Sequence, residues 1–255
     1  MTILPHLNAE LIHAVYARAG GNEIESGKFD SPESSAALAA NVFGYFCDTA
    51  RLPDFPRGGH FSFLTSPVNR IDLERSLRFP WSGGSHPWLD AVIETTDWLA
   101  GIESKRFEPF RDTKTSGFSE AYDRDVWGAN MQPFIEMKDA IISGKLQFKF
   151  LDAVQLVKHA FGIRTQAARA GKRPALVYLY AEPPGYPDGR IIPATHFAAH
   201  QAEVARFAEA VSGAEVEFSA LSHQSLNAEF LASPSPALVS HARAVRAAFL
   251  ANPSS

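Results

Sequence analysis

Three charged residues in one short stretch of this chain have the types and spacing for metal-dependent chemistry: Asp90, Glu103 and Lys105. Hard cations such as Mg²⁺ prefer carboxylate and carbonyl oxygens as ligands. A lysine beside such an ion would orient an attacking water or hold a phosphate oxygen. Two carboxylates held side by side repel each other, and a divalent cation between them would turn that repulsion into attraction.

The elements that must position these residues are two β-strands. Residues 88–95 and 98–107 are both short and rich in β-branched, aromatic and aliphatic side chains, which predicts a hairpin with residues 96–97 as its turn. That turn places Thr95 opposite Trp98.

Counting outward from the turn brings the three charged residues together. Asp90 falls opposite Glu103, and because side chains alternate between the faces of a strand, Lys105 shares the face of Glu103. A slip of one residue would send Asp90 to the other face. The pattern alone favours an ordinary solvated strand face, since an acid, a spacer and a lysine occur together by chance in many proteins.

Asp90 followed by Glu103-Ser104-Lys105 resembles the PD-(D/E)xK nuclease superfamily, with Pro87 displaced from its usual place directly before the aspartate. Longer segments are similar to a restriction-endonuclease-like branch of that superfamily, and the resemblance covers roughly residues 30–225. These segments are residues 79–84, 103–107, 155–162 and 179–183.

The resemblance implies an Mg²⁺-dependent endodeoxyribonuclease, with Mn²⁺ as a substitute ion and DNA as its partner. It implies that Asp90, Glu103 and the main-chain carbonyl of Ser104 bind the metal. Lys105 would position the attacking water and stabilise charge on the phosphate. Gln155, from a helix after the strands, would contact the scissile phosphate or a metal-bound water.

Three further residues are candidates for the same site, each with a competing structural explanation. Glu74 is either an additional acid near the metal or part of an exposed charged strand. Asn41 matches the first-helix position of the superfamily only loosely, and a structural role is favoured. His159 stands one turn after Gln155, where related nucleases carry an aromatic residue, and an ordinary helix histidine is favoured.

A basic and aromatic stretch follows the hairpin. Arg106, Arg111, Lys114 and Arg124 alternate with aromatic residues over residues 106–127, a pattern that suits contact with phosphates and bases. Acidic residues within the stretch nearly cancel its charge. It is expected to be a loop near the site, with substrate contact as the less favoured function.

Composition limits the class of protein. The chain has 255 residues, 45% of them hydrophobic, and a formal net charge of -4, so one domain over residues 1–255 is expected, without a global basic signal for nucleic acid. Cys47 is the only cysteine, which favours a reducing, cytoplasmic compartment. No apolar run approaches the ~20 residues that span a bilayer.

The order of predicted elements indicates a mixed α/β (α+β) sheet flanked by helices, as in the restriction-endonuclease-like fold. The core would cover roughly residues 30–225, with extra C-terminal helices in residues 226–255. Strands are expected at residues 61–64, 71–77, 88–95, 98–107, 174–181 and 216–221. Helices are expected at residues 9–19, 31–46, 132–143, 151–168, 194–211, 222–231 and 238–250.

Two other functions compete with the nuclease. A catalytically inactive DNA- or protein-binding module on the same fold would suit the acidic charge balance. A metal-independent hydrolase ranks last, because the sequence has no nucleophile elbow and no zinc-spaced histidine pair. Cutting both strands of a duplex commonly calls for two active sites, so a homodimer is one expected assembly.

Overall fold

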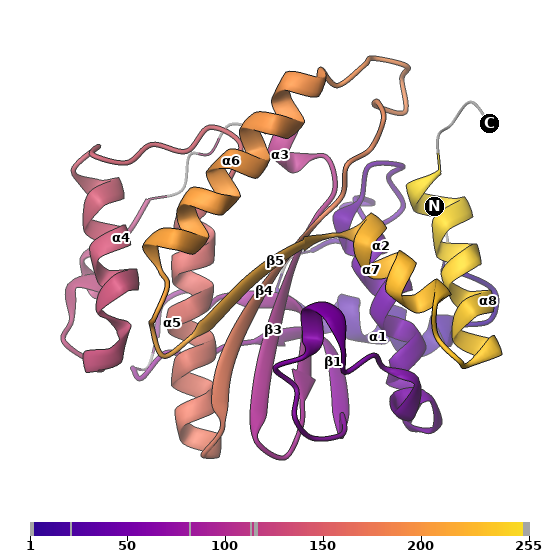
Figure 1. Cartoon of the computed structure of the whole chain (residues 1–255), viewed down its shortest axis with the longest axis horizontal. Helices are drawn as coiled ribbons and strands as arrows, with labels where there is room; N and C mark the ends of the chain where they lie inside the picture. The colour runs from indigo at the N-terminus through magenta and orange to yellow at the C-terminus, as the bar shows by residue number, and fades with distance from the viewer. Residues whose placement is uncertain (1–2, 21, 82, 113, 115–116, 252–255) are drawn as a thin grey trace.

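The computed structural model describes residues 3–20, 22–81, 83–112, 114 and 117–251. Ser82, within the resembling segment 79–84, lies outside them. The strands are β1 (Arg70–Ser76), β2 (Trp88–Glu94), β3 (Trp98–Lys105), β4 (Arg173–Tyr180) and β5 (Glu217–Ser222) (Figure 1). The helices are α1 (Ala9–Arg18), α2 (Ser35–Phe43), α3 (Glu108–Arg111), α4 (Gln132–Ile142), α5 (Ala153–Ala170), α6 (Ala194–Ala210), α7 (His223–Leu231) and α8 (Pro236–Val245). Shorter helical turns are η1 (Gly44–Cys47), η2 (Thr49–Asp54), η3 (Gly59–Phe61), η4 (Glu120–Asp123), η5 (Ala129–Met131) and η6 (Arg246–Leu250).

The five strands form one mixed sheet in the order β1-β2-β3-β4-β5. Strand β2 runs antiparallel to β1 and to β3, whereas β4 runs parallel to β3 and β5 runs parallel to β4. A turn over residues 95–97 connects β2 to β3, and helices lie in the two parallel connections, as the geometry of such connections requires. The prediction of a mixed α/β sheet flanked by helices is therefore confirmed.

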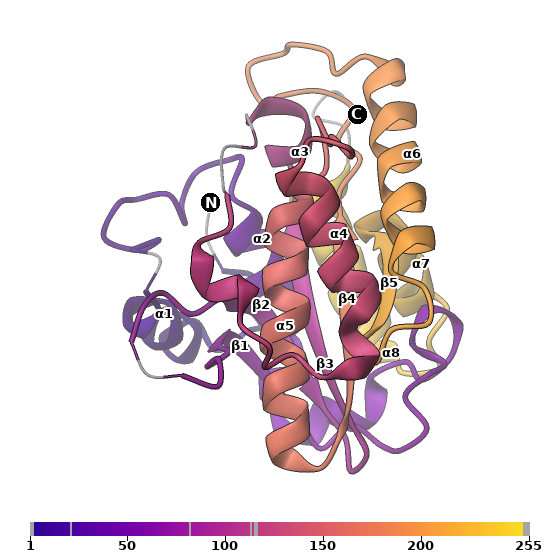
Figure 2. The ribbon, with the colours of Figure 1, turned by 90° about the vertical axis from the view of Figure 1, so that its left-hand side faces the viewer.

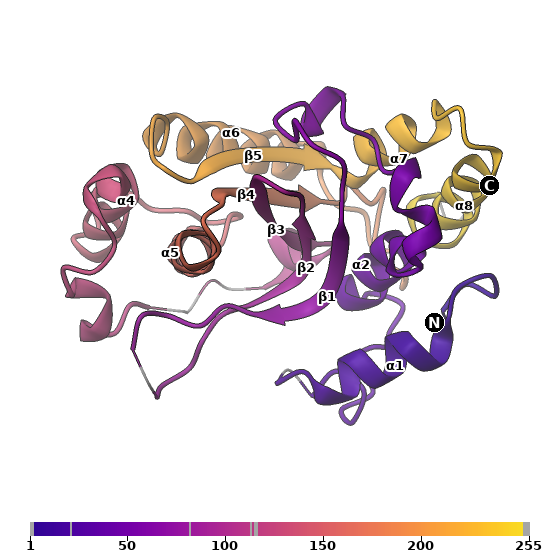
Figure 3. The ribbon, with the colours of Figure 1, turned by 90° about the horizontal axis from the view of Figure 1, so that it is seen from below.

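Helices cover both faces of the sheet (Figures 2 and 3). Residues of α4, α5 and α6 pack into one apolar cluster with one face. Residues of α1, α2, α7 and α8 pack into a second cluster with the other face. Strand β4 is buried along most of its length between these layers, which suits a continuous apolar run.

Helix α5 begins and ends at residues suited to those positions. The Asp152 side chain accepts a hydrogen bond from the Gln155 N–H, and Gly171 adopts a left-handed conformation with φ of 65° at the other end. An acidic N-cap and a left-handed glycine are the favoured terminal residues of helices. Across the described residues, no helix is both long enough and apolar enough to cross a membrane.

Two predicted elements differ from the structure. Residues 61–64 do not form a strand: Phe61 ends η3, and the Leu64 N–H bonds to the Phe61 carbonyl. Phe61 and Leu64 are both buried, and a spacing of three suits a tight helical turn rather than a strand. Helix α2 begins at Ser35 rather than at residue 31, because the Ser34 side chain caps the Ala37 N–H.

The β2–β3 hairpin has the predicted register. The Thr95 N–H donates to the Trp98 carbonyl at 3.0 Å, and the strand pairs continue outward to Ala91 opposite Ile102. The Thr95 hydroxyl accepts the Trp98 N–H at 2.9 Å and bonds to the Asp97 carboxylate at 3.0 Å. These side-chain contacts explain how a Thr-Asp pair closes a turn that usually favours Asn-Gly.

The side-chain alternation of β2 is interrupted at Asp90. Leu89 and Val92 pack into the cluster on the α5 face, while Ala91 and Ile93 pack into the opposite cluster. Strict alternation would put Leu89 on the same face as Ala91. On the neighbouring strand, Glu74 has a φ of 47°, a conformation that non-glycine residues rarely adopt and that costs free energy.

Gly101 on β3 makes room for the displaced Leu89. A Cβ atom at Gly101 would lie 2.2 Å from Leu89 Cδ1 and 3.5 Å from Ile163 Cδ1. Since Leu89 is fully buried, its side chain has little space to retreat into. The glycine and the interruption at Asp90 are therefore two parts of one local arrangement.

We expect Gly101→Ala to lower the free energy of unfolding by about 1–3 kcal/mol, because it overpacks a closed part of the core. In a Leu89→Ala background the same change should cost at least ~0.5 kcal/mol less, since the clashing atoms are gone. Urea unfolding of the wild type, both single variants and the double variant measures this coupling. Additive effects of the two substitutions would contradict the packing described.

Candidate functional site

Asp90 contacts the backbone of β3 at the point where pairing between β2 and β3 stops. Its Oδ2 accepts a hydrogen bond from the Ser104 N–H at 2.7 Å, one step beyond the last strand pair, Ala91 opposite Ile102. The carboxylate thus takes the place of a backbone partner. The structure brings Asp90 and Ser104 into direct contact.

The Ser104 peptide is held from both sides. Its Oγ lies 2.9 Å from Nε2 of His223, the first residue of α7, and both side chains are buried. The N–H and carbonyl of one strand residue point toward the same neighbour, so the Ser104 carbonyl lies on the Asp90 side. The next carbonyl, that of Lys105, accepts the Ala181 N–H on the opposite side.

Glu103 lies between Lys105 and His159. Its Oε1 is 2.5 Å from Lys105 Nζ, and its Oε2 is 3.0 Å from His159 Nδ1 on α5. The exposed fraction of the Glu103 side chain is only 3%. The predicted sharing of one face by Glu103 and Lys105 is confirmed, whereas His159, expected as an ordinary helix histidine, contacts Glu103.

The acidic residues have very different pKa values. Burial would raise the pKa of Glu103, but Lys105 and then His159 outweigh it and lower that pKa to about 2. Burial, followed by the charges of Glu103 and Glu74, raises the pKa of Asp90 well above its usual range. The surroundings of Asp90 therefore oppose its ionisation, because one lysine cannot balance all of the neighbouring carboxylates.

Glu74 belongs to the same electrostatic group. Burial raises its pKa to about 7, and repulsion from Glu103 and Glu23 adds to the effect of burial. Burial alone would lower the pKa of Lys105. The negative charges of Glu103, Glu108 and Asp90 outweigh burial and raise that pKa, which keeps the ammonium charged. Glu74, proposed from the sequence as an extra acid, is thus electrostatically linked to the site.

The donor chemistry of the site fits Mg²⁺. Asp90, Glu103 and the Ser104 carbonyl supply oxygens, and magnesium commonly uses one or two carboxylates with water and phosphate completing its shell. Within the described part of the chain, no three His, Cys, Asp or Glu side chains are grouped as a preformed metal cage. Binding would require Asp90 to be ionised, and Glu103 would exchange a contact with Lys105 or His159 for one with the ion.

Gln155 and His159 line a cavity of about 440 Å³ next to these residues. Trp88, two residues before Asp90, lines the same cavity. Gln155 is therefore near His159, but among the described residues no hydrogen bond joins its side chain to Asp90, Glu103 or Lys105. Asn41 is not in the site: its amide accepts the Leu4 N–H and donates to the Ala37 carbonyl, each at 2.8 Å.

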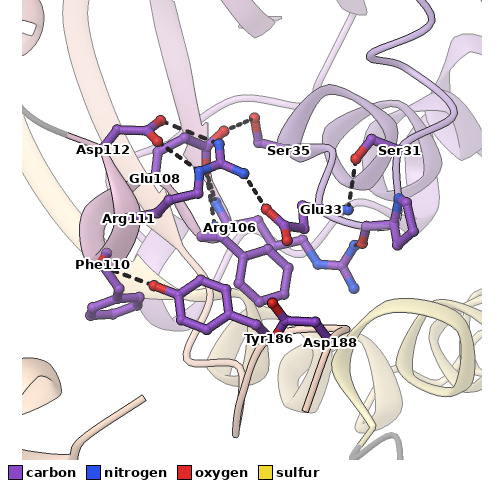
Figure 4. Close-up of polar contacts among 12 residues, drawn as sticks. Ser31, Glu33, Ser35, Arg106, Glu108, Phe110, Arg111, Asp112, Tyr186 and Asp188 are labelled. Atoms are coloured by element: carbon purple, nitrogen blue, oxygen red, sulfur yellow. Dashed lines mark hydrogen bonds and ion pairs between the residues drawn. The ribbon is translucent and has the colours of Figure 1, made fainter. Parts of the chain in front are cut away.

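The cationic residues after β3 are engaged in structural contacts (Figure 4). Arg106 is buried and donates to the carbonyls of Pro32 and Phe249. Arg111 pairs with Glu33 and Asp112 (Figure 4). Two of the four cations in this stretch, Arg106 and Arg111, therefore tie the segments around β3 together.

Glu108 fixes the chain directly after β3 to α2. Its Oε2 accepts the Arg106 and Phe107 N–H groups at 2.8 and 3.0 Å, and its Oε1 accepts the Ser35 hydroxyl at 2.5 Å (Figure 4). Lys105 is the last residue of β3, so these bonds limit its movement. The charge pattern of the sequence did not distinguish Glu108 from its acidic neighbours.

Comparison with protein-family models, with curated proteins and with solved structures found no match to this chain.

We expect the free energy of unfolding to fall as pH rises from about 4.5 to about 7, because Glu74 ionises later in the folded chain than in the unfolded chain. Glu74→Gln should flatten that fall by roughly 1–3 kcal/mol. Denaturant unfolding at pH 5 and pH 7.5 measures the difference. Glu217→Gln, at an exposed position of β5, is the control. If the free energy of unfolding depends on pH identically in the wild type and in Glu74→Gln, this electrostatic grouping is contradicted.

Proposed function

We propose that this protein is a metal-dependent nuclease that hydrolyses DNA phosphodiester bonds on a restriction-endonuclease-like fold. The observation that carries the proposal is the meeting of Asp90, Glu103, Ser104 and Lys105 where β2 stops pairing with β3. A buried group of acids whose pKa values are driven far apart is typical of a functional site. The order α2, β1, β2, β3, α5, β4 supports the αβββαβ core that the sequence resemblance implies.

Asp90, Glu103 and the Ser104 carbonyl would hold one Mg²⁺, or Mn²⁺ in its place. When bound, the ion supplies positive charge to phosphate oxygens and lowers the pKa of water. Asp90 is already oriented by the Ser104 N–H, and the His223 contact keeps that peptide in position. His159 orients Glu103 through its 3.0 Å contact.

Lys105 would act directly on the reacting groups. Its ammonium is held by Glu103 at 2.5 Å and stays charged at neutral pH. A fixed cation at this place would orient the attacking water and stabilise the charge that develops on the phosphate. Gln155, which lines the adjoining cavity, would contact the scissile phosphate.

An inactive DNA- or protein-binding module is the second candidate function. It is favoured by one observation: both Glu103 oxygens are occupied by Lys105 and His159. In such a module these contacts would be permanent, and the buried charges would serve only the stability of the fold. Cys47 as the only cysteine of the sequence suits the proposed cytoplasmic location under either function.

We expect the purified protein to nick or linearise plasmid DNA with Mg²⁺ or Mn²⁺ and not with EDTA. Asp90→Asn, Glu103→Gln and Lys105→Met should each lower the cleavage rate at least ~100-fold, the usual scale for removing one transition-state contact. Gel-based cleavage rates measure this. Lys145→Ala, at an exposed lysine, should cleave like wild type.

The melting temperature of each variant shows whether it has folded. Folded Asp90, Glu103 and Lys105 variants that cleave as fast as the wild type would overturn the proposal. A wild type that binds DNA but never cleaves it with either metal would support the binding module instead.

A further inference from the structure

The cavity beside the acidic site has the size of a small-ligand pocket. Its volume of about 440 Å³ lies within the ~300–1,000 Å³ that is common for such pockets. His159 joins the two places, since it lines the cavity and also contacts Glu103 at 3.0 Å. A group bound in the cavity would therefore sit next to the proposed reaction centre.

Aromatic rings form part of the cavity wall. Trp88, His86 and Tyr122 all line it. Trp88 is 38% exposed, and among the large apolar side chains that are exposed in the described chain it is the one aromatic residue. Its Nε1 edge lies against Gly20, where a Cβ atom would be 3.4 Å away. An exposed indole held at one edge offers a ring face for stacking.

Charge in the cavity is balanced rather than positive. Lys158 and Asp152 both line it, and the attraction of Asp152 opposes the effect of burial on the pKa of the Lys158 ammonium. The Lys158 ammonium also lies 5.7 Å from the centres of the Phe118 and Tyr122 rings. A phosphate would gain little from such a pair, whereas a neutral aromatic heterocycle suits it.

Polar groups around the rings match the edge of a base. Gln155 contributes an amide with donors and an acceptor. His86 Nδ1 accepts the Phe79 N–H at 3.2 Å, which leaves Nε2 of the neutral ring as a donor. Hydrogen-bonding groups beside a stacking ring are how proteins hold an unstacked base.

We propose that this cavity binds one unpaired nucleobase of the strand being cut, so that the substrate is single-stranded or locally unpaired nucleic acid rather than a continuous duplex. The inference rests on the proposed nuclease function for the place of the phosphate, which would lie at Asp90, two residues from Trp88. Two cations after β3 that could otherwise contact phosphates, Arg106 and Arg111, are engaged within the chain. Duplex binding relies on many phosphate contacts by such residues.

The test compares binding of three DNA probes by fluorescence anisotropy in EDTA, where no cleavage occurs. The probes are a single strand, its blunt duplex, and the single strand with abasic sites in place of its bases. We expect the wild type to bind the single strand more tightly than the other two. Trp88→Ala should weaken single-strand binding at least ~5-fold, and Trp88→Phe should keep it within about 2-fold, because stacking tolerates a different ring.

A matched control is Ile142→Ala, which truncates another exposed apolar side chain, at the end of α4. It should bind all three probes like the wild type. Equal binding of the normal and abasic strands, or a Trp88→Ala protein that binds like the wild type, would overturn the base-binding cavity.

Cleavage assays on the same probes with Mg²⁺ keep the two proposals separate. Base-dependent binding without cleavage with any metal would contradict the proposed nuclease function. It would still support the proposal that the cavity binds a nucleobase. Cleavage that is equal on duplex and single strand, and unchanged in Trp88→Ala, would contradict the proposal that the cavity binds a nucleobase. It would still support the proposed nuclease function.

Discussion

The site depends on one hydrogen bond, from the Ser104 N–H to the Asp90 carboxylate. It forms where the hairpin pairs end, so a side chain takes over from the backbone of β2. The Asp90 side chain therefore lies between the two strands. The side chain of Leu89 packs on the α5 face of the sheet, against Gly101. An irregular strand next to buried acids is a frequent device for directing side chains at functional sites.

The electrostatics follow from that placement. Asp90, Glu74 and Glu103 affect one another's pKa, and a single ammonium, that of Lys105, lies among them. Without another cation, the balance is kept by a raised pKa at Asp90 and Glu74. A protein gains no stability from holding acids in this state, because each raised pKa means that ionisation opposes folding. The proposed divalent cation would remove this opposition to ionisation.

Much of the local geometry could be predicted from the sequence. A two-residue turn fixes the register of a hairpin, so the spacing of Thr95 and Trp98 was enough to align Asp90 with the level of Glu103. Period-two alternation placed Glu103 and Lys105 on one face. The mixed sheet and the long helix α5 followed from apolar periodicity and from the residues at the helix ends.

Other features depend on contacts between distant parts of the chain. The contact of Ser104 with His223 joins residues 119 positions apart, and the contact of His159 with Glu103 requires α5 to pack on β3. The left-handed Glu74 is set by its neighbours rather than by its own preference. The cations after β3 looked available for DNA because their acceptors, such as the Pro32 and Phe249 carbonyls, have no signature in the sequence.

The most direct test of the account is a crystal structure of the protein soaked in Mn²⁺, with the ion located by its anomalous scattering. We predict an ion bound by Asp90, Glu103 and the Ser104 carbonyl, with Glu103 released from Lys105 or His159. Crystals saturated with Mn²⁺ that show no ion at this place, and in which Glu103 keeps both contacts, would contradict the account.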